Sequence, residues 1–162
     1  MGYITAIETA VPENKYTQDE LRDFYLRSTD NEIYRRKIKV VSDRSGINTR
    51  HSVVGDFKGG ISGADLFNNT VALLPEPTLT ERMSLYKNKA LPLALDAVSR
   101  IKNFEEIKSS ITHIISVTCT GLFAPGLDIE LMRELKLNPN VNRSAVNFMG
   151  CNAAILALKQ AD

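Results

Sequence analysis

An apolar run in the second half of the chain, from Ile111 to Thr118, sets the expected fold class. Its near-continuous hydrophobicity predicts a strand that is buried on both faces, as in α/β sheets. A helix is predicted next, over Asp128 to Leu137, then a second strand over Val141 to Phe148 and a helix over Asn152 to Ala161. Strand, helix, strand and helix in this order predict a layered α/β domain.

The beginning of the chain carries shorter signals. Apolar residues interleaved with small ones predict a strand from Gly2 to Val11, which Pro12 ends. Thr17 followed three residues later by Glu20 is a capping box, and it predicts that a helix begins there. Apolar residues at helical spacing predict a second helix over about Asn31 to Ser42.

The middle of the chain contains the longest helical pattern. A short extended stretch is expected over Ile47 to Val54, and the glycine-rich segment Gly55 to Gly63 is expected to be a loop. Asp65 to Leu74 has the composition of a short helix. The long pattern then runs from Thr78 to about Ile101, and Pro92 inside it predicts a kink or a break.

Composition narrows the class of protein. The chain has 162 residues, which fits one domain, with 43% hydrophobic and 24% charged residues as in globular proteins. No apolar run reaches the ~20 residues of a membrane span, and no secretory signal is visible. Lys and Arg number 20 against 19 Asp and Glu, a balance that gives no electrostatic argument for nucleic acid or membrane partners.

Two cysteines and the end of the chain give two further expectations. Cys119 and Cys151 cannot form a disulfide framework, so a reducing, cytoplasmic location is expected. The sequence stops at Asp162, within or just after the last predicted helix, with no glycine or proline to end it. We therefore expect the chain to be the N-terminal part of a longer protein.

Cys151 is the main candidate functional residue, because it falls where a predicted strand gives way to a predicted helix. Unpaired amide groups and the positive end of the helix dipole at such a junction favour thiolate over thiol. A thiolate attacks thioester carbonyls, and the same amides can stabilise an oxyanion. Gly150 leaves room for a sharp turn. On these residues alone, a small cysteine in the hydrophobic core remains the alternative.

Four segments in the last third of the chain carry a family resemblance. They are Ile111-Thr112-His113, Thr118-Cys119-Thr120-Gly121, Ala124-Pro125-Gly126-Leu127-Asp128 and Phe148-Met149-Gly150-Cys151. Together they resemble the N-terminal half of type III polyketide synthases, the chalcone and stilbene synthase family. Ile7 to Pro12 is similar to the first strand and turn of that family. Ser45 to Arg50 is similar to a segment of thiolase-like condensing enzymes in general.

The resemblance implies a thiolase-like fold, in which two similar α/β halves form a layered αβαβα arrangement. Residues 1–162 would be the N-terminal domain, with the C-terminal half absent. The family's nucleophile falls on Cys151, which would accept a starter acyl group from an acyl-CoA. Decarboxylative condensation with malonyl-CoA would then extend it, with no metal and no organic cofactor. The family's catalytic His and Asn lie in the absent half, so the chain alone is expected to be inactive.

The remaining candidate residues come from the same resemblance. Cys119 and Thr120 fall on positions that line the family's substrate cavity, and Met149 also falls in this substrate pocket. For Cys119, a small wall residue and a thiol that reacts with intermediates are the two alternatives. Ala124 falls on a loop that reaches the partner subunit's cavity, and its bond to the following proline is a candidate cis peptide. Arg50 falls near the family's CoA-phosphate ligands, which suits a guanidinium.

Other sequence features leave alternatives open. His51 and His113 do not match the catalytic histidine, so we expect His51 on the surface and His113 in the core. The resemblance also implies a homodimer through the strand Val141 to Phe148, because an exposed edge strand invites pairing. A β-ketoacyl-ACP synthase III, a hydroxymethylglutaryl-CoA synthase-like enzyme and a non-catalytic dimerisation module are the alternative functions.

Overall fold

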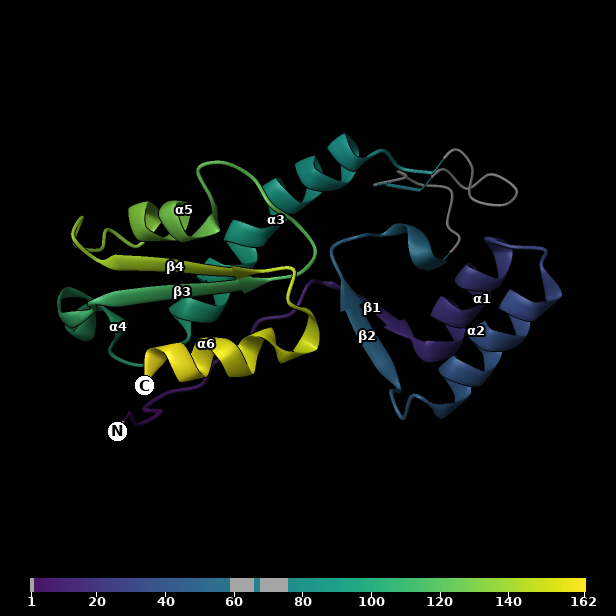
Figure 1. Ribbon diagram of the computed structural model, residues 1–162, viewed down its shortest axis with the longest axis horizontal. Helices are drawn as coiled ribbons and strands as arrows, with labels where there is room; N and C mark the ends of the chain where they lie inside the picture. The colour runs from purple at the N-terminus through teal and green to yellow at the C-terminus, as the bar shows by residue number, and fades with distance from the viewer. Residues whose placement is uncertain (1, 59–65, 68–75) are drawn as a thin grey trace. The chain divides into compact units, whose positions relative to one another are not determined.

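The computed structural model describes residues 2–58, 66–67 and 76–162 (Figure 1). They form two compact units. We call Val11–Glu81 the α-hairpin unit, and Met1–Ala10 with Arg82–Asp162 the α/β unit. The helix predicted over Asp65 to Leu74 lies outside the described residues, apart from Leu66 and Phe67.

The α-hairpin unit joins a small sheet to two helices. Strand β1 (Asn14–Thr17) pairs antiparallel with β2 (Thr49–Ser52), and the chain between them forms α1 (Gln18–Arg27) and α2 (Glu32–Arg44). The predicted second helix is confirmed, and it continues to Arg44. The extended stretch predicted around β2 is confirmed as well.

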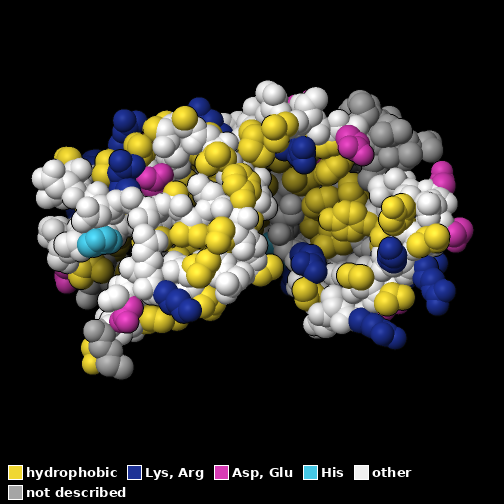
Figure 2. Space-filling model, viewed as in Figure 1, with side chains coloured by type: hydrophobic (Ala, Val, Ile, Leu, Met, Phe, Trp, Pro, Cys, Tyr) yellow, Lys and Arg dark blue, Asp and Glu magenta, His cyan; other side chains and the backbone are white. Residues whose placement is uncertain are grey.

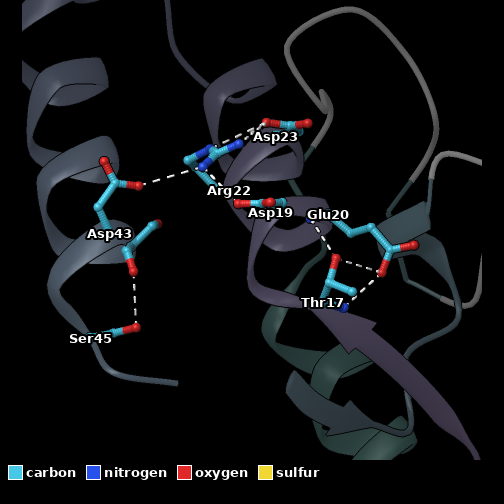
Figure 3. Close-up of polar contacts among 8 residues, drawn as sticks. Thr17, Asp19, Glu20, Arg22, Asp23, Asp43 and Ser45 are labelled. Atoms are coloured by element: carbon cyan, nitrogen blue, oxygen red, sulfur yellow. Dashed lines mark hydrogen bonds and ion pairs between the residues drawn. The ribbon is translucent and has the colours of Figure 1, made fainter. Parts of the chain in front are cut away.

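Helix α1 begins at the capping box that the sequence predicts (Figure 3). The Glu20 amide donates to Thr17 Oγ1 at 3.2 Å, and the Thr17 amide donates to Glu20 Oε2 at 2.7 Å. The bond from the Thr17 backbone holds the pKa of Glu20 below its ordinary value, because it favours the ionised carboxylate. Helix α2 begins in a related way, with the Asn31 side chain accepting two amide hydrogen bonds.

Charged side chains link α1 to α2 at the surface. Arg22 of α1 lies 2.7 Å from Asp19 and 3.5 Å from Asp43 of α2, and it also faces Asp23 (Figure 3). The three carboxylates are mostly exposed to solvent. Exposed ion pairs of this kind contribute little to stability, so packing of the core must supply most of the unit's stability.

That core is aromatic. Tyr16 and Phe24 are the largest fully buried side chains of the described residues. The Phe24 ring packs edge-on against Phe57 and Phe67, with centroids 4.8 and 5.2 Å away. The Tyr16 hydroxyl donates to the Val54 carbonyl at 2.8 Å, so the one polar atom of the ring is paired.

The α/β unit is built on two parallel strands. Strand β3 (His113–Thr118) pairs with β4 (Asn142–Asn147), and α5 (Leu127–Glu134) lies between them in sequence. Helix α6 (Ala153–Ala161) follows β4. Figure 1 shows α5 and α6 on opposite sides of the strand pair. The strand–helix–strand–helix prediction is therefore confirmed, with each strand within two residues of its expected ends.

Two more helices precede β3. Helix α3 (Leu79–Ser99) begins at a second capping box, in which the Glu81 amide donates to Thr78 Oγ1 at 3.2 Å. A hydrogen bond from the Thr78 side chain lowers the pKa of Glu81. Helix α3 runs through Pro92 without interruption, so a break there was a wrong prediction. The short helix α4 (Phe104–Ile107) follows.

The strand predicted from Gly2 to Val11 does not form. The segment has no regular structure in the described residues, and Tyr3, Ile4 and Ile7 are at least two-thirds exposed. Alternating apolar residues favour a strand only when a second strand accepts their backbone hydrogen bonds. In the part of the chain that is described, β3 pairs with β4 and not with this segment.

The burial predicted for β3 was also wrong. Ser116 is the one buried residue of that strand, and the others are partly or fully exposed. His113, expected in the core, is exposed, and its Nδ1 lies 2.9 Å from Thr112 Oγ1. A strand is buried on both faces only where other elements cover it along its full length. Among the described residues β3 pairs with β4 alone, so its other edge is also uncovered.

Within the described residues, no helix has the length and apolar character that crossing a membrane requires.

Candidate active site

Cys151 lies between β4 and α6, as the sequence predicts. It is the middle residue of η4 (Gly150–Asn152), a single 3₁₀ turn that leads directly into α6. The residue is exposed, so the structure does not place it in the hydrophobic core. The first amides of a helix have no partner within that helix, and they carry partial positive charge. Cys151 is therefore an exposed residue at the amino end of a helix, where a negative charge is favoured.

The turn that carries Cys151 has an unusual backbone. Phe148 adopts φ 58°, and Gly150 adopts φ 70°. Left-handed geometry costs a residue with a side chain about 1–2 kcal/mol, whereas glycine adopts it readily. A Cβ atom at Gly150 would meet no atom within 4 Å, so the backbone angle alone favours glycine here.

Cys119 contacts this turn from the end of β3. Its Sγ accepts a hydrogen bond from the Gly150 amide at 3.1 Å and lies 3.6 Å from the Gly150 carbonyl oxygen, to which the thiol can donate. The family resemblance implies a cavity-lining position for Cys119 and gives no indication of this contact. The two residues are 31 positions apart, and no local pattern links them.

The other predicted pocket residues lie at the surface. Thr120 and Ala124 are exposed in the loop between β3 and α5, and Met149 is 56% exposed in the turn before Cys151. The peptide bond from Ala124 to Pro125 is cis, which confirms that prediction. These positions are close in sequence to Cys119 and Cys151, and their role in binding substrate remains a prediction.

A cavity of about 320 Å³ lies between the strand pair and the beginning of α5. It is lined by strand residues that include Ser116, Thr118 and Asn147, and by none of the four predicted pocket residues. Asp128 of α5 and Arg143 of β4 form an ion pair in its wall, with a distance of 2.7 Å between Oδ2 and the guanidinium. No local sequence pattern indicates this pair, because its two residues are 15 positions apart.

The loop after Cys119 packs tightly at Gly121. A Cβ atom there would lie 2.1 Å from Cγ of Tyr86, which is far inside van der Waals contact. Glycine is therefore required for the loop to approach the Tyr86 ring this closely. The contact fixes the path of the chain two residues beyond Cys119.

Arg50 belongs to the α-hairpin unit. It stands opposite Tyr16 in the β1–β2 register, and its Nε donates to Gln18 Oε1 at 3.2 Å. With Arg22 and Lys37 it lines a groove of about 490 Å³ beside α1 and α2. The neighbouring His51 is exposed, as predicted, with Nδ1 2.8 Å from the Pro12 carbonyl oxygen.

Metal ligands do not gather in the part of the chain that is described. Among residues 2–58, 66–67 and 76–162, no group of three His, Cys, Asp or Glu side chains could hold a metal ion.

A parallel strand pair between helices, with an exposed cysteine at the strand-to-helix junction, defines an α/β domain with a candidate nucleophile. Residues 1–162 match the family described as chalcone and stilbene synthases, N-terminal domain, and the chain belongs to this family. An alpha-pyrone synthesis polyketide synthase-like protein of Mycobacterium tuberculosis is 31% identical over 159 residues. That alignment covers 98% of this chain and 38% of the relative.

Solved structures agree with the family. A polyketide synthase from the brown alga Ectocarpus siliculosus superposes with a TM-score of 0.81 at 27% identity, and it is covered to 42%. The C-terminal type III polyketide synthase domain of Steely1 from Dictyostelium gives 0.79 at 30% identity, also covered to 42%. Each comparison covers 98% of this chain. The chain therefore has the fold of the N-terminal part of type III polyketide synthases and spans well under half the length of these proteins.

Proposed function

We propose that Cys151 is the acyl-accepting nucleophile of a type III polyketide synthase. The observation that carries the proposal is the exposed Cys151 residue in the turn at the amino end of α6. In the first step, the Cys151 thiolate attacks the thioester carbonyl of a starter acyl-CoA. The bond from the carbonyl to the CoA sulfur breaks, CoA leaves as a thiolate, and the acyl group becomes a thioester of Cys151.

Chain extension would follow on the same sulfur. Malonyl-CoA loses CO2, and the resulting carbanion attacks the acyl carbon bound to Cys151. A carbon–carbon bond forms, and the Cys151 thiolate leaves. Amides at the start of α6 would stabilise the negative charge that develops on the thioester oxygen. The histidine and asparagine that the family uses for decarboxylation do not fall within this sequence, so acylation of Cys151 is the step assigned to these residues.

Arg50 is our proposed contact for the phosphates of CoA. It shares its groove with Arg22 and Lys37, so three cationic side chains line one depression of the α-hairpin unit. Arg22 is paired with Asp19, Asp23 and Asp43, whereas Arg50 donates to the neutral side chain of Gln18. Among the described residues no carboxylate pairs with Arg50, and such a guanidinium is better able to bind a phosphate. No metal or organic cofactor enters this proposal.

Alkylation by iodoacetamide tests whether Cys151 is reactive. In the 162-residue chain, we expect iodoacetamide to label Cys151 about fivefold faster than the cysteine of an unstructured peptide, because the amides at the start of a helix favour negative charge on the attacking sulfur. Mass spectrometry of the tryptic peptides measures the rates at Cys151 and Cys119 separately. A rate at Cys151 no higher than that of the peptide cysteine would contradict the proposal.

A second experiment uses the intact protein and tests acylation by a substrate. A starter acyl-CoA should add one acyl group at Cys151 and none in Cys151→Ala. Arg50→Gln should raise the acyl-CoA concentration needed for half-maximal acylation and leave the iodoacetamide rate unchanged, with Lys15→Gln as a control for general charge. Equal acyl-CoA dependence in Arg50→Gln and the wild type would remove Arg50 from the proposal.

We also propose that the protein forms a homodimer through β4. In the described residues, β4 pairs with β3 on one side and has no partner strand on the other. The Asn142 and Phe148 amides donate to β3, so the Ala145 amide, at an odd position, points to the open edge. An edge with free donors pairs readily with another strand.

Ala145→Pro tests the dimer, because it removes an outward donor and leaves the β3 ladder intact. The wild type should elute with a light-scattering mass near twice the 18.0 kDa of one chain, and Ala145→Pro near 18.0 kDa. Ala145→Ser keeps the amide and should remain dimeric. A monomeric wild type, or a dimeric proline variant, would show that β4 is not the interface.

Three alternative functions are less well supported. Membership in the chalcone and stilbene synthase family favours a polyketide synthase over a β-ketoacyl-ACP synthase III or a hydroxymethylglutaryl-CoA synthase. A non-catalytic dimerisation module predicts no acylation of Cys151, so the acyl-CoA experiment separates it from the proposed enzyme. We propose a cytoplasmic location, supported by two free cysteines, and fractionation of cells expressing the intact protein tests it.

A further inference from the structure

We infer that Cys119 is a positioning residue, whose thiol holds Gly150 and thereby fixes the turn that presents Cys151. The inference concerns the same site as the proposed function, and its importance for catalysis rests on that proposal. The hydrogen bonds between Cys119 and Gly150 do not depend on the proposed function, because they are a property of the fold. Cys119 would touch neither substrate nor the reacting atoms in this role, and it would act through Gly150.

The backbone ladder between β3 and β4 ends just before the turn that contains Gly150. The last backbone bond runs from the Phe148 amide to the Thr118 carbonyl at 3.0 Å. In a parallel ladder, the next donor on that side of the strand would be the Gly150 amide, two residues further on. The left-handed conformation of Phe148 turns the chain away at this point. The Gly150 amide instead reaches the sulfur of Cys119 at 3.1 Å.

The thiol can satisfy both polar groups of Gly150. A cysteine sulfur accepts a hydrogen bond through a lone pair and donates one through its proton. Here it accepts from the Gly150 amide, and the Gly150 carbonyl lies 3.6 Å away, within reach of the S–H group. The Cys119 side chain can therefore replace both hydrogen bonds that the backbone of a neighbouring strand makes in a regular ladder. In effect, Cys119 extends the pairing of β3 and β4 beyond the last backbone bond.

Gly150 in turn connects to the helix. Its carbonyl accepts the amide of Ala153, the first residue of α6. Gly150 is thus tied to β3 through Cys119 and to α6 through Ala153, and Cys151 is the residue that follows it. Movement of Gly150 would move the Cys151 sulfur relative to the amides of α6.

Side-chain packing offers the turn little support. Phe148 is 59% exposed and Met149 is 56% exposed. Glycine itself has no side chain to pack, and it has more backbone freedom than any other residue. Hydrogen bonds must therefore fix a turn that also contains a strained residue, Phe148. Among the contacts described for Gly150, those with Cys119 link it to the strand pair.

Two substitutions separate the hydrogen bond from the volume of the side chain. Cys119→Ser keeps a donor and an acceptor, whereas Cys119→Ala removes both. Amide hydrogen exchange of Gly150 in the 162-residue chain, measured by NMR, reports the bond directly. We expect exchange at Gly150 to become about fivefold faster in Cys119→Ala, the factor one hydrogen bond is typically worth. In Cys119→Ser it should stay within about twofold of the wild type.

The rate of Cys151 alkylation provides the functional readout. Loosening the turn should lower that rate by about threefold in Cys119→Ala, toward the value of a free cysteine, and Cys119→Ser should restore it. The Val146 amide, inside the β3–β4 ladder, is the internal control and should not change. If the alanine variant also loosens Val146, Cys119→Val replaces it, because valine fills the space without accepting a hydrogen bond.

Each outcome decides one proposal. Unchanged Gly150 exchange in Cys119→Ala, or failure of serine to restore it, would overturn the role of Cys119. A wild-type Cys151 that alkylates like a free cysteine would instead overturn the proposed nucleophile, while the Gly150 exchange still decides the role of Cys119. Faster exchange at Gly150 with an unchanged alkylation rate would show a structural contact that does not position Cys151, and this too would overturn the inference.

Discussion

Replacing Phe24 with alanine is expected to lower the free energy of unfolding of the α-hairpin unit by about 3–5 kcal/mol. The side chain is 2% exposed and packs edge-on against Phe57 and Phe67. Removing the ring takes away buried apolar area and leaves a cavity between aromatic neighbours that can only partly relax. Urea denaturation of the 162-residue chain, followed by far-UV circular dichroism, measures the loss.

Two control variants show whether the core is responsible. Phe24→Leu keeps most of the apolar volume and should cost clearly less than the alanine variant. Ile33→Ala changes a residue of α2 that is 67% exposed, and it should shift stability by no more than about 0.5 kcal/mol. If Phe24→Ala and Ile33→Ala were equally mild, the aromatic cluster would not be the core of this unit.

The elements that sequence analysis predicted correctly depend on local chemistry. The capping box at Thr17 needs only residues within one helical turn, and it begins α1 as expected. The strand Gly2 to Val11 failed for the opposite reason. Its alternation of residues is local, but its hydrogen bonds must come from a partner strand that local sequence does not specify. Burial of β3 was overestimated for the same reason, because it depends on what covers the strand.

In the candidate site too, the local features could be predicted from sequence and the long-range contact could not. The junction that holds Cys151 could be predicted, since a strand pattern, a glycine and a helix pattern follow one another directly. The bond between Cys119 and Gly150 could not, because it joins positions 31 residues apart and depends on the turn at Phe148. A cysteine also gives no sign in sequence of whether its thiol will react, pack or bind a backbone amide.

The ion pair between Asp128 and Arg143 is expected to contribute strongly to the stability of the α/β unit. Asp128 has 11% of its side chain exposed and Arg143 has 34%, and their atoms lie 2.7 Å apart. Arg143→Met should lower the free energy of unfolding of the α/β unit by about 2–4 kcal/mol, because a nearly buried carboxylate loses its partner. The partial exposure of Arg143 places the value below that of a fully buried pair. Urea denaturation again measures it.

The double variant Asp128→Leu with Arg143→Met distinguishes loss of the charge pair from loss of packing. It removes both charges and keeps apolar volume, so no buried carboxylate remains unpaired. We expect it to lie within about 1 kcal/mol of the wild type and to be more stable than Arg143→Met alone. If the double variant lost as much stability as the single variants Asp128→Leu and Arg143→Met lose together, the two residues would not be coupled. Packing would then stabilise the part of the α/β unit around this cavity. Ser116 of β3 and Ala145 of β4, which are paired in the sheet and both line the cavity, would be the residues to test.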